Sequence, residues 1–135
     1  MARILIIDDM APIRESINII LSDQGHEIDE AEDGKKGLKK LHNGDYDLVI
    51  TDILMPEKDG TEILMKIRSE GLSTPVIAMS GGGNLISEDY ALEMAKNYAN
   101  AVLKKPFSRD KLRSIVDDLL QTENGGELKN KEGSL

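Results

Sequence analysis

Five residues with chemically useful side chains stand just after short hydrophobic runs of this sequence. They are Asp8 and Asp9 after the first run, Asp52 and Ser80 after two later runs, and Lys105 after the last. Ligands of open α/β sheets bind beyond the carboxyl ends of the strands, which is where such residues would lie if the runs are strands. All five are therefore candidate site residues.

The acidic residues among them could share one metal ion. If the first and third runs form neighbouring strands about 4.8 Å apart, carboxylates from both can reach an ion at about 2.0 to 2.1 Å. Two carboxylates about 5 Å apart repel by roughly 3 kcal/mol at an effective dielectric constant near 20, so they need a counter-ion. Lys105 can supply one positive charge. A small set of oxygen ligands favours Mg²⁺ over zinc or copper.

A structural explanation exists for each aspartate taken alone. Aspartates at strand ends often cap helices or accept hydrogen bonds from loop amides. Three carboxylates, a hydroxyl and a lysine at one edge of a sheet are harder to explain in that way, although structural charge clusters also occur. The set as a whole therefore indicates a functional site, which no single member does.

The hydrophobic runs have the pattern of strands in a parallel sheet. Near-continuous apolar runs are typical of strands covered on both faces, and the segments between them carry apolar residues at helical spacings of three and four. Pro12, Asp33, Ser87 and Ser108 indicate helix starts. An α/β fold with helices on both faces of the sheet follows. The predicted strands are Arg3–Ile7, Glu27–Ala31, Leu48–Thr51, Val76–Met79 and Ala101–Lys104.

The length and composition fit a single domain. A chain of 135 residues, 39% of them hydrophobic, can bury one core of ordinary size. The helical pattern ends at Leu120, and residues 121–135 are polar and contain Gly125 and Gly126. We expect one domain over residues 1–120 and a flexible tail over residues 121–135, with no room for an output domain.

Charge and residue usage exclude several classes of partner. The net charge of -8 repels nucleic acid backbones and anionic lipid surfaces. The chain has no cysteine, which excludes disulfides and thiolate chemistry and fits a reducing compartment. No apolar run is long enough for a signal peptide or a membrane span. We expect a cytoplasmic protein that binds neither nucleic acid nor membrane.

From about Ala2 to Leu120, the sequence resembles the receiver domains of response regulators in two-component phosphorelays. The resemblance implies a flavodoxin-like, doubly wound (βα)5 fold with strand order 2-1-3-4-5. It depends on the ordered motifs Leu5-Ile6-Ile7-Asp8-Asp9, Asp52-Ile53-Leu54-Met55-Pro56-Glu57-Lys58-Asp59-Gly60, Ser80 and Lys105-Pro106-Phe107.

The resemblance also implies a role for each candidate residue. Asp52 would be the phosphoacceptor, Asp8 and Asp9 the acidic pair, Ser80 the switch hydroxyl, and Lys105 the cation that pairs with the phosphoryl group. Mg²⁺ would bind Asp9, Asp52 and the carbonyl group of Leu54, with Asp8 acting through water. A carboxylate can attack phosphorus to form an acyl phosphate, and the metal and the lysine neutralise the developing charge. Lys105-Pro106 is a candidate cis peptide.

Two features of the sequence depart from the family pattern. Val102 stands where receivers usually place an aromatic residue, three residues before the lysine. Gly81, Gly82 and Gly83 follow Ser80 and allow the backbone unusual freedom. We therefore expect the Ser80 to Ile86 loop to carry most of the response to phosphorylation, and the readout to be helix 4 and strand 5.

The leading hypothesis is a stand-alone, non-enzymatic switch. It would accept a phosphoryl group from a histidine kinase or histidine phosphotransfer protein and present a changed surface to a downstream protein. A flavodoxin-like nucleotide or flavin binder would need a glycine- and hydroxyl-rich loop in place of Asp8-Asp9-Met10, and more aromatic residues. A magnesium-dependent phosphatase for small molecules would need a substrate-binding cap, for which no spare sequence remains.

Overall fold

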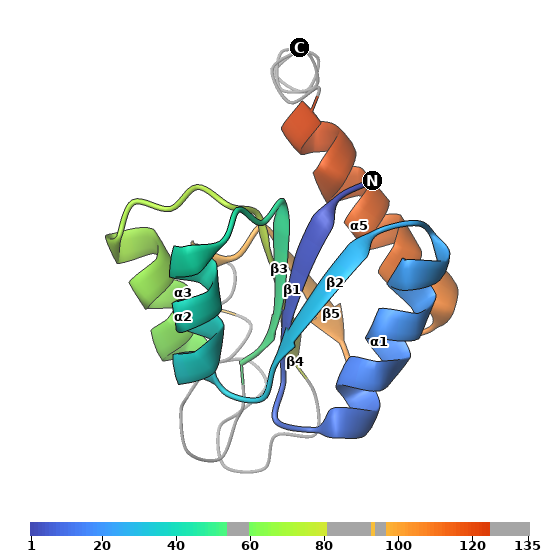
Figure 1. Ribbon diagram of the computed structural model, residues 1–135, viewed down its shortest axis with the longest axis horizontal. Coiled ribbons are helices and arrows are strands. Elements are labelled where there is room, and N and C mark those ends of the chain that lie inside the picture. The colour runs from blue at the N-terminus through green and yellow to red at the C-terminus, as the bar shows by residue number, and fades with distance from the viewer. Residues whose placement is uncertain (54–59, 81–92, 94–96, 125–135) are drawn as a thin grey trace.

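The computed structural model describes residues 1–53, 60–80, 93 and 97–124 (Figure 1). Within these ranges the strands are β1 (Arg3–Ile7), β2 (Glu27–Ala31), β3 (Leu48–Asp52), β4 (Val76–Ser80) and β5 (Ala101–Lys104). The helices are α1 (Ala11–Asp23), α2 (Gly34–Asn43), α3 (Gly60–Ser69) and α5 (Arg109–Asn124).

The strands form one parallel sheet in the order β2-β1-β3-β4-β5. β2 and β5 are the edges, and β3 lies in the centre between β1 and β4. The carboxyl ends of all five strands therefore lie along the same edge of the sheet. The predicted flavodoxin-like fold, its strand order and its parallel pairing are confirmed.

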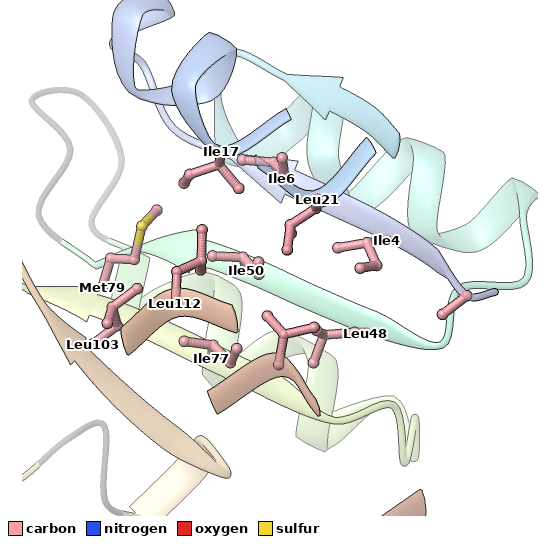
Figure 2. Close-up of a cluster of buried hydrophobic side chains, with 12 residues drawn as sticks. Ile4, Ile6, Ile17, Leu21, Leu48, Ile50, Ile77, Met79, Leu103 and Leu112 are labelled. Carbon is pink, nitrogen blue, oxygen red and sulfur yellow. The ribbon is translucent and has the colours of Figure 1, made fainter. Parts of the chain in front are cut away.

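Helices cover both faces of this sheet, with α2 and α3 on one face and α1 and α5 on the other (Figure 1). Alternate residues of a strand point to opposite faces, so each strand contributes to two cores. Leu5 and Ile7 of β1 pack with residues of α2 and α3. Ile4 and Ile6 pack with Ile17 of α1 in the second core, which also contains residues of α5 (Figure 2).

Most of the predicted helix starts are confirmed. Pro12 lies in the first turn of α1, where its missing N–H breaks no helical hydrogen bond. The side chain of Asp33 accepts a hydrogen bond from the backbone N of Lys36 (2.8 Å), and that of Ser108 accepts one from the backbone N of Lys111 (3.0 Å). The start predicted after Ser87 lies outside the described residues.

The structure extends three elements beyond the predicted limits. β3 ends at Asp52 and β4 at Ser80, one residue later than predicted, because these polar residues still pair in register, Asp52 with Met79 and Ser80 with Lys104. Helix α5 continues to Asn124, four residues past Leu120, where the helical pattern was predicted to end. The rest of the predicted tail, Leu54 and the loop that starts at Gly81 lie outside the described residues.

Candidate functional site

The fold brings the predicted site residues to the edge of the sheet formed by the carboxyl ends of the strands. Asp8 follows the last residue of β1, Asp52 ends β3, Ser80 ends β4, and Lys105 follows the last residue of β5. Four separate strands thus deliver one or two groups each. We refer to Asp8, Asp9, Asp52, Ser80 and Lys105 as the carboxyl-end cluster.

The three acidic residues of the carboxyl-end cluster lie within reach of one another. One carboxylate oxygen from each of Asp8, Asp9 and Asp52 lies within 4.8 Å of the others. Asp8 is fully buried and Asp52 nearly so, whereas Asp9 is exposed. Burial of two carboxylates is costly unless cations and hydrogen-bond donors compensate for the lost solvation.

Lys105 provides that compensation. Its Nζ atom donates to Oδ2 of Asp8 at 2.9 Å and to Oδ2 of Asp52 at 3.2 Å. Burial by itself lowers the pKa of the Lys105 ammonium group, but the hydrogen bond to Asp8 and the charge of Asp52 outweigh it and raise the pKa above its ordinary value. Lys105 therefore holds its positive charge between the two buried carboxylates.

Both carboxylate oxygens of Asp8 accept hydrogen bonds. Its Oδ1 atom accepts a hydrogen bond from the backbone N of Met10 at 2.9 Å, while Oδ2 accepts from Lys105. The backbone N of Asp8 donates to the carbonyl oxygen of Ala31 on the neighbouring strand β2 (3.2 Å). The position of this residue is thus determined by both its backbone and its side chain.

Ser80 is the least satisfied polar group of the cluster. The residue is buried, and its hydroxyl oxygen has no hydrogen-bond partner within the described part of the chain. The carbonyl oxygen of Ser80 accepts from the backbone N of Lys105 at 2.6 Å, and the Lys105-Pro106 peptide bond, a candidate cis peptide from the sequence, is cis. A buried hydroxyl without a partner is ready to donate a hydrogen bond to an added group.

One residue beside this cluster is not among the predicted site residues. Arg14, on α1, donates from Nη1 to the carbonyl oxygen of Asp8 at 2.6 Å. The only sequence signal is its place on the helix, three residues before the buried Ile17, which puts it next to the apolar face. An arginine so close to a buried stripe needs acceptors, and the backbone carbonyl group of Asp8 and the carboxylate of Glu30 supply them.

The carboxyl-end cluster fits a small divalent cation. Counting the described residues alone, one ammonium group pairs with two of three clustered carboxylates, and the cluster carries an excess negative charge of two when all three are ionised. The available ligands are oxygens alone, as Mg²⁺ prefers. The arrangement can therefore bind a hard cation and, through it, a phosphoryl group.

Comparison with known proteins identifies the family. Residues 4–117 match the model of the response regulator receiver domain. The chain belongs to this family. Receiver domains are the phosphoryl-accepting switches of response regulators, and the acidic cluster agrees with the Mg²⁺ site that such domains carry.

Curated relatives of this receiver domain are longer proteins. The transcriptional regulatory protein DltR of Streptococcus agalactiae is 34% identical over 114 residues, which are 84% of this chain and 50% of that protein. The transcriptional regulatory protein CiaR of Streptococcus pneumoniae is 31% identical over 121 residues, 90% of this chain and 52% of CiaR. The chain thus spans about half the length of these relatives, and its stand-alone organisation stays a prediction.

Solved receiver structures agree with the fold. The response regulator TrrA from Thermotoga maritima, in complex with Mg²⁺-BeF, is 36% identical, covers 88% of this chain and 99% of its own, and has a TM-score of 0.77. The chemotaxis protein CheY4 of Vibrio cholerae is 28% identical, with a TM-score of 0.78 over 88% of this receiver and 98% of CheY4.

Val102, the valine in place of the usual aromatic residue, lies within the described part of the receiver. Val102 is partly buried and packs against the core beneath α2 and α3, opposite Ala78 in the β4–β5 register. Among the described helices none has the length and apolar character to cross a membrane. The cytoplasmic location stays a prediction.

Proposed function

We propose that this receiver accepts a phosphoryl group on Asp52 from a histidine kinase or a histidine phosphotransfer protein. A carboxylate oxygen of Asp52 forms a bond to phosphorus while the bond from phosphorus to the donor imidazole breaks, and the imidazole nitrogen keeps the electron pair. The observation that carries this proposal is the place of Asp52 at the end of the central strand, among the acids, Ser80 and Lys105.

Asp52 is a better acceptor than either neighbour. Asp8 is fully buried, and hydrogen bonds from Met10 and Lys105 hold both of its carboxylate oxygens, so a phosphoryl donor has no access to it. Asp9 is exposed and does not contact Lys105 in the described structure. Asp52 combines slight exposure, 5% of its surface, with the Lys105 contact. That contact neutralises part of the charge that grows on the phosphoryl oxygens.

The remaining site residues are proposed as ligands and stabilising groups. Asp9 and Asp52 would hold Mg²⁺ directly and Asp8 through water, and the predicted fourth ligand, the Leu54 carbonyl group, lies outside the described residues. When bound, Mg²⁺ supplies charge neutralisation at the phosphoryl oxygens. Lys105 stays charged because its pKa is raised, and its ammonium group can move to a phosphoryl oxygen once Asp52 has become an acyl phosphate.

The buried hydroxyl of Ser80 supports the proposed switch. A phosphoryl group adds about -1.5 to -2 units of charge and three acceptor oxygens, and the Ser80 hydroxyl has no competing partner in the described chain. We propose that its donation to phosphate draws the Ser80 to Ile86 loop inward and alters a partner surface around helix 4 and strand β5. The downstream target is a protein, and residues 1–120 form the receiver unit.

Intact-protein mass spectrometry tests the acceptor. Acetyl phosphate and Mg²⁺ should add one phosphate to the wild type and none to Asp52→Asn. Asp29→Asn, which removes a carboxylate of β2 that pairs with Arg3 instead, is the matched control and should react like the wild type. Phosphate on Asp52→Asn at wild-type yield would contradict the assignment.

Hydrogen exchange tests the switch. With a phosphoryl mimic and Mg²⁺, amides between Ser80 and Ala91 and those of β5 should change their protection, because the Ser80 hydroxyl moves onto the new acceptor. Ser80→Ala removes the donor and should suppress most of that change while it leaves phosphorylation of Asp52 intact. Changes limited to Asn43 to Gly60 would refute the proposed route.

A further inference from the structure

Arg14 links helix α1 to the two strands next to it. Its Nη1 atom donates to the carbonyl oxygen of Asp8, and its Nε atom donates to Oε1 of Glu30 on β2 at 3.1 Å. The Arg14 side chain is only 16% exposed. A guanidinium group with two fixed acceptors and little exposure has few alternative orientations.

A second set of hydrogen bonds holds the partner of Arg14. Oε2 of Glu30 accepts from Nδ2 of Asn18 at 2.7 Å, and Oδ1 of Asn18 accepts from the hydroxyl of Ser22 at 2.6 Å. Both oxygens of Glu30 are thus engaged, one by Arg14 and one by Asn18. This chain of side chains, from Ser22 to Arg14, places the guanidinium group against the end of β1.

The contact at Asp8 acts on the backbone. The Asp8 carbonyl group belongs to the planar peptide that joins Asp8 to Asp9, so a donor at its oxygen restrains the orientation of the whole plane. Asp9 is exposed and has no side-chain partner within the described residues. Its carboxylate is therefore directed toward Asp8 and Asp52 mainly by the backbone that Arg14 restrains.

We propose that Arg14 is a positioning residue for the metal ligands, acting through the Asp8 carbonyl group, and that Glu30 fixes Arg14 for that task. Glu30 balances the charge of Arg14, so the pair supplies direction and adds little positive charge to the site. Partners that orient metal ligands typically change metal affinity by about 10- to 100-fold when removed. This inference rests on the proposed Mg²⁺-dependent function.

Mg²⁺ titration calorimetry tests this role. Arg14→Ala should raise the Kd for Mg²⁺ by about tenfold, the lower end of that range, because the N–H group and the carboxylate of Asp8 keep their hydrogen bonds. Arg14→Lys retains one donor and should fall between Arg14→Ala and the wild type. Phosphorylation of Arg14→Ala by acetyl phosphate should be slow at low Mg²⁺ and approach the wild-type rate at saturating Mg²⁺.

Arg3→Ala is the matched control. Arg3 also pairs with a carboxylate of β2, Asp29, but from the first residue of β1, away from the carboxyl-end cluster. Both arginine variants should lower Tm, and only Arg14→Ala should change the Kd for Mg²⁺. An unchanged Kd in Arg14→Ala would refute the positioning role. Failure of the wild type to bind Mg²⁺ would instead refute the proposed function.

Discussion

The carboxyl-end cluster and a second charged cluster of the sheet differ in how completely their charges are paired. We refer to Arg3, Asp29 and Tyr46 as the amino-end cluster. In the amino-end cluster, Arg3 Nη2 pairs with Asp29 Oδ2 at 3.0 Å, and the hydroxyl of Tyr46 donates to the same oxygen at 2.6 Å. The guanidinium group of Arg3 also lies 4.8 Å from the centre of the Tyr46 ring. The charges of one cation and one carboxylate thus balance, although the Nε atom of Arg3 has no hydrogen-bond partner within the described residues.

The carboxyl-end cluster has no such balance. Among the described residues, one lysine pairs with two of the three carboxylates, and the hydroxyl of Ser80 is buried without a partner. Excess charge and an unused donor lower stability unless a ligand compensates for them. We infer from this comparison that the charge balance of the amino-end cluster serves the fold, whereas the carboxyl-end cluster keeps negative charge and a hydroxyl donor that a bound cation and a phosphoryl group would use.

Removal of the lysine should have the largest effect on stability. Lys105→Met leaves Asp8 and Asp52 buried without their cation, so the free energy of unfolding in EDTA should fall by about 2 to 3 kcal/mol. Urea denaturation followed by circular dichroism measures this loss. Mg²⁺ should restore more stability to Lys105→Met than to the wild type, and an equal Mg²⁺ effect in both proteins would contradict the charge imbalance.

Removal of one carboxylate should have opposite signs in the two clusters. Asp9→Asn relieves repulsion, so unfolding in EDTA should cost about 1 kcal/mol more, while the affinity for Mg²⁺ should fall at least tenfold. Asp29→Asn should instead destabilise the protein and leave Mg²⁺ binding unchanged. Denaturation and calorimetry on both variants check the signs, and a destabilised Asp9→Asn would break the comparison.

The hydroxyl of Tyr46 should contribute about 1 kcal/mol, because it donates to a charged acceptor. Burial and the hydrogen bond to Asp29 raise the pKa of Tyr46 to about 12. Its folded-state pKa exceeds the unfolded value of 10.0, so this stabilisation is present below pH 10 and is lost as the pH rises toward 12. The tyrosinate absorbance difference between wild type and Tyr46→Phe should show that midpoint, and one near 10 would contradict it.

Acid titration of the amino-end cluster should give the smallest effect. The hydrogen bond from Tyr46, helped by Arg3, lowers the pKa of Asp29 below 3.8 despite its partial burial. The stabilisation is therefore present above pH 3.8 and is lost as the pH falls through the folded-state pKa. Between pH 5 and 2 the wild type should lose more stability than Asp29→Asn, by less than about 1 kcal/mol. Parallel losses would show that Asp29 is not stabilised.

The sequence predicted β1, β3 and β4 most directly, because their apolar runs are nearly continuous. It predicted the site because the carboxyl ends of parallel strands meet at the same edge of the sheet. The missed strand ends, Asp52 and Ser80, are polar side chains whose backbones still pair. Arg14 and the amino-end cluster could not be predicted in the same way. Their contacts depend on how closely α1 approaches β1, and on a tyrosine 17 residues away from the aspartate it binds.

The wide sequence separation within the carboxyl-end cluster has a consequence for the order of assembly. Lys105 is 97 residues from Asp8 and 53 residues from Asp52, and the two carboxylates belong to the first and third strands. During synthesis, Asp8 and Asp52 leave the ribosome long before Lys105. Contacts that close such long loops of the chain form slowly. A nascent or truncated chain without β5 thus holds uncompensated acids, and competence to receive a signal arises only when the last strand has docked.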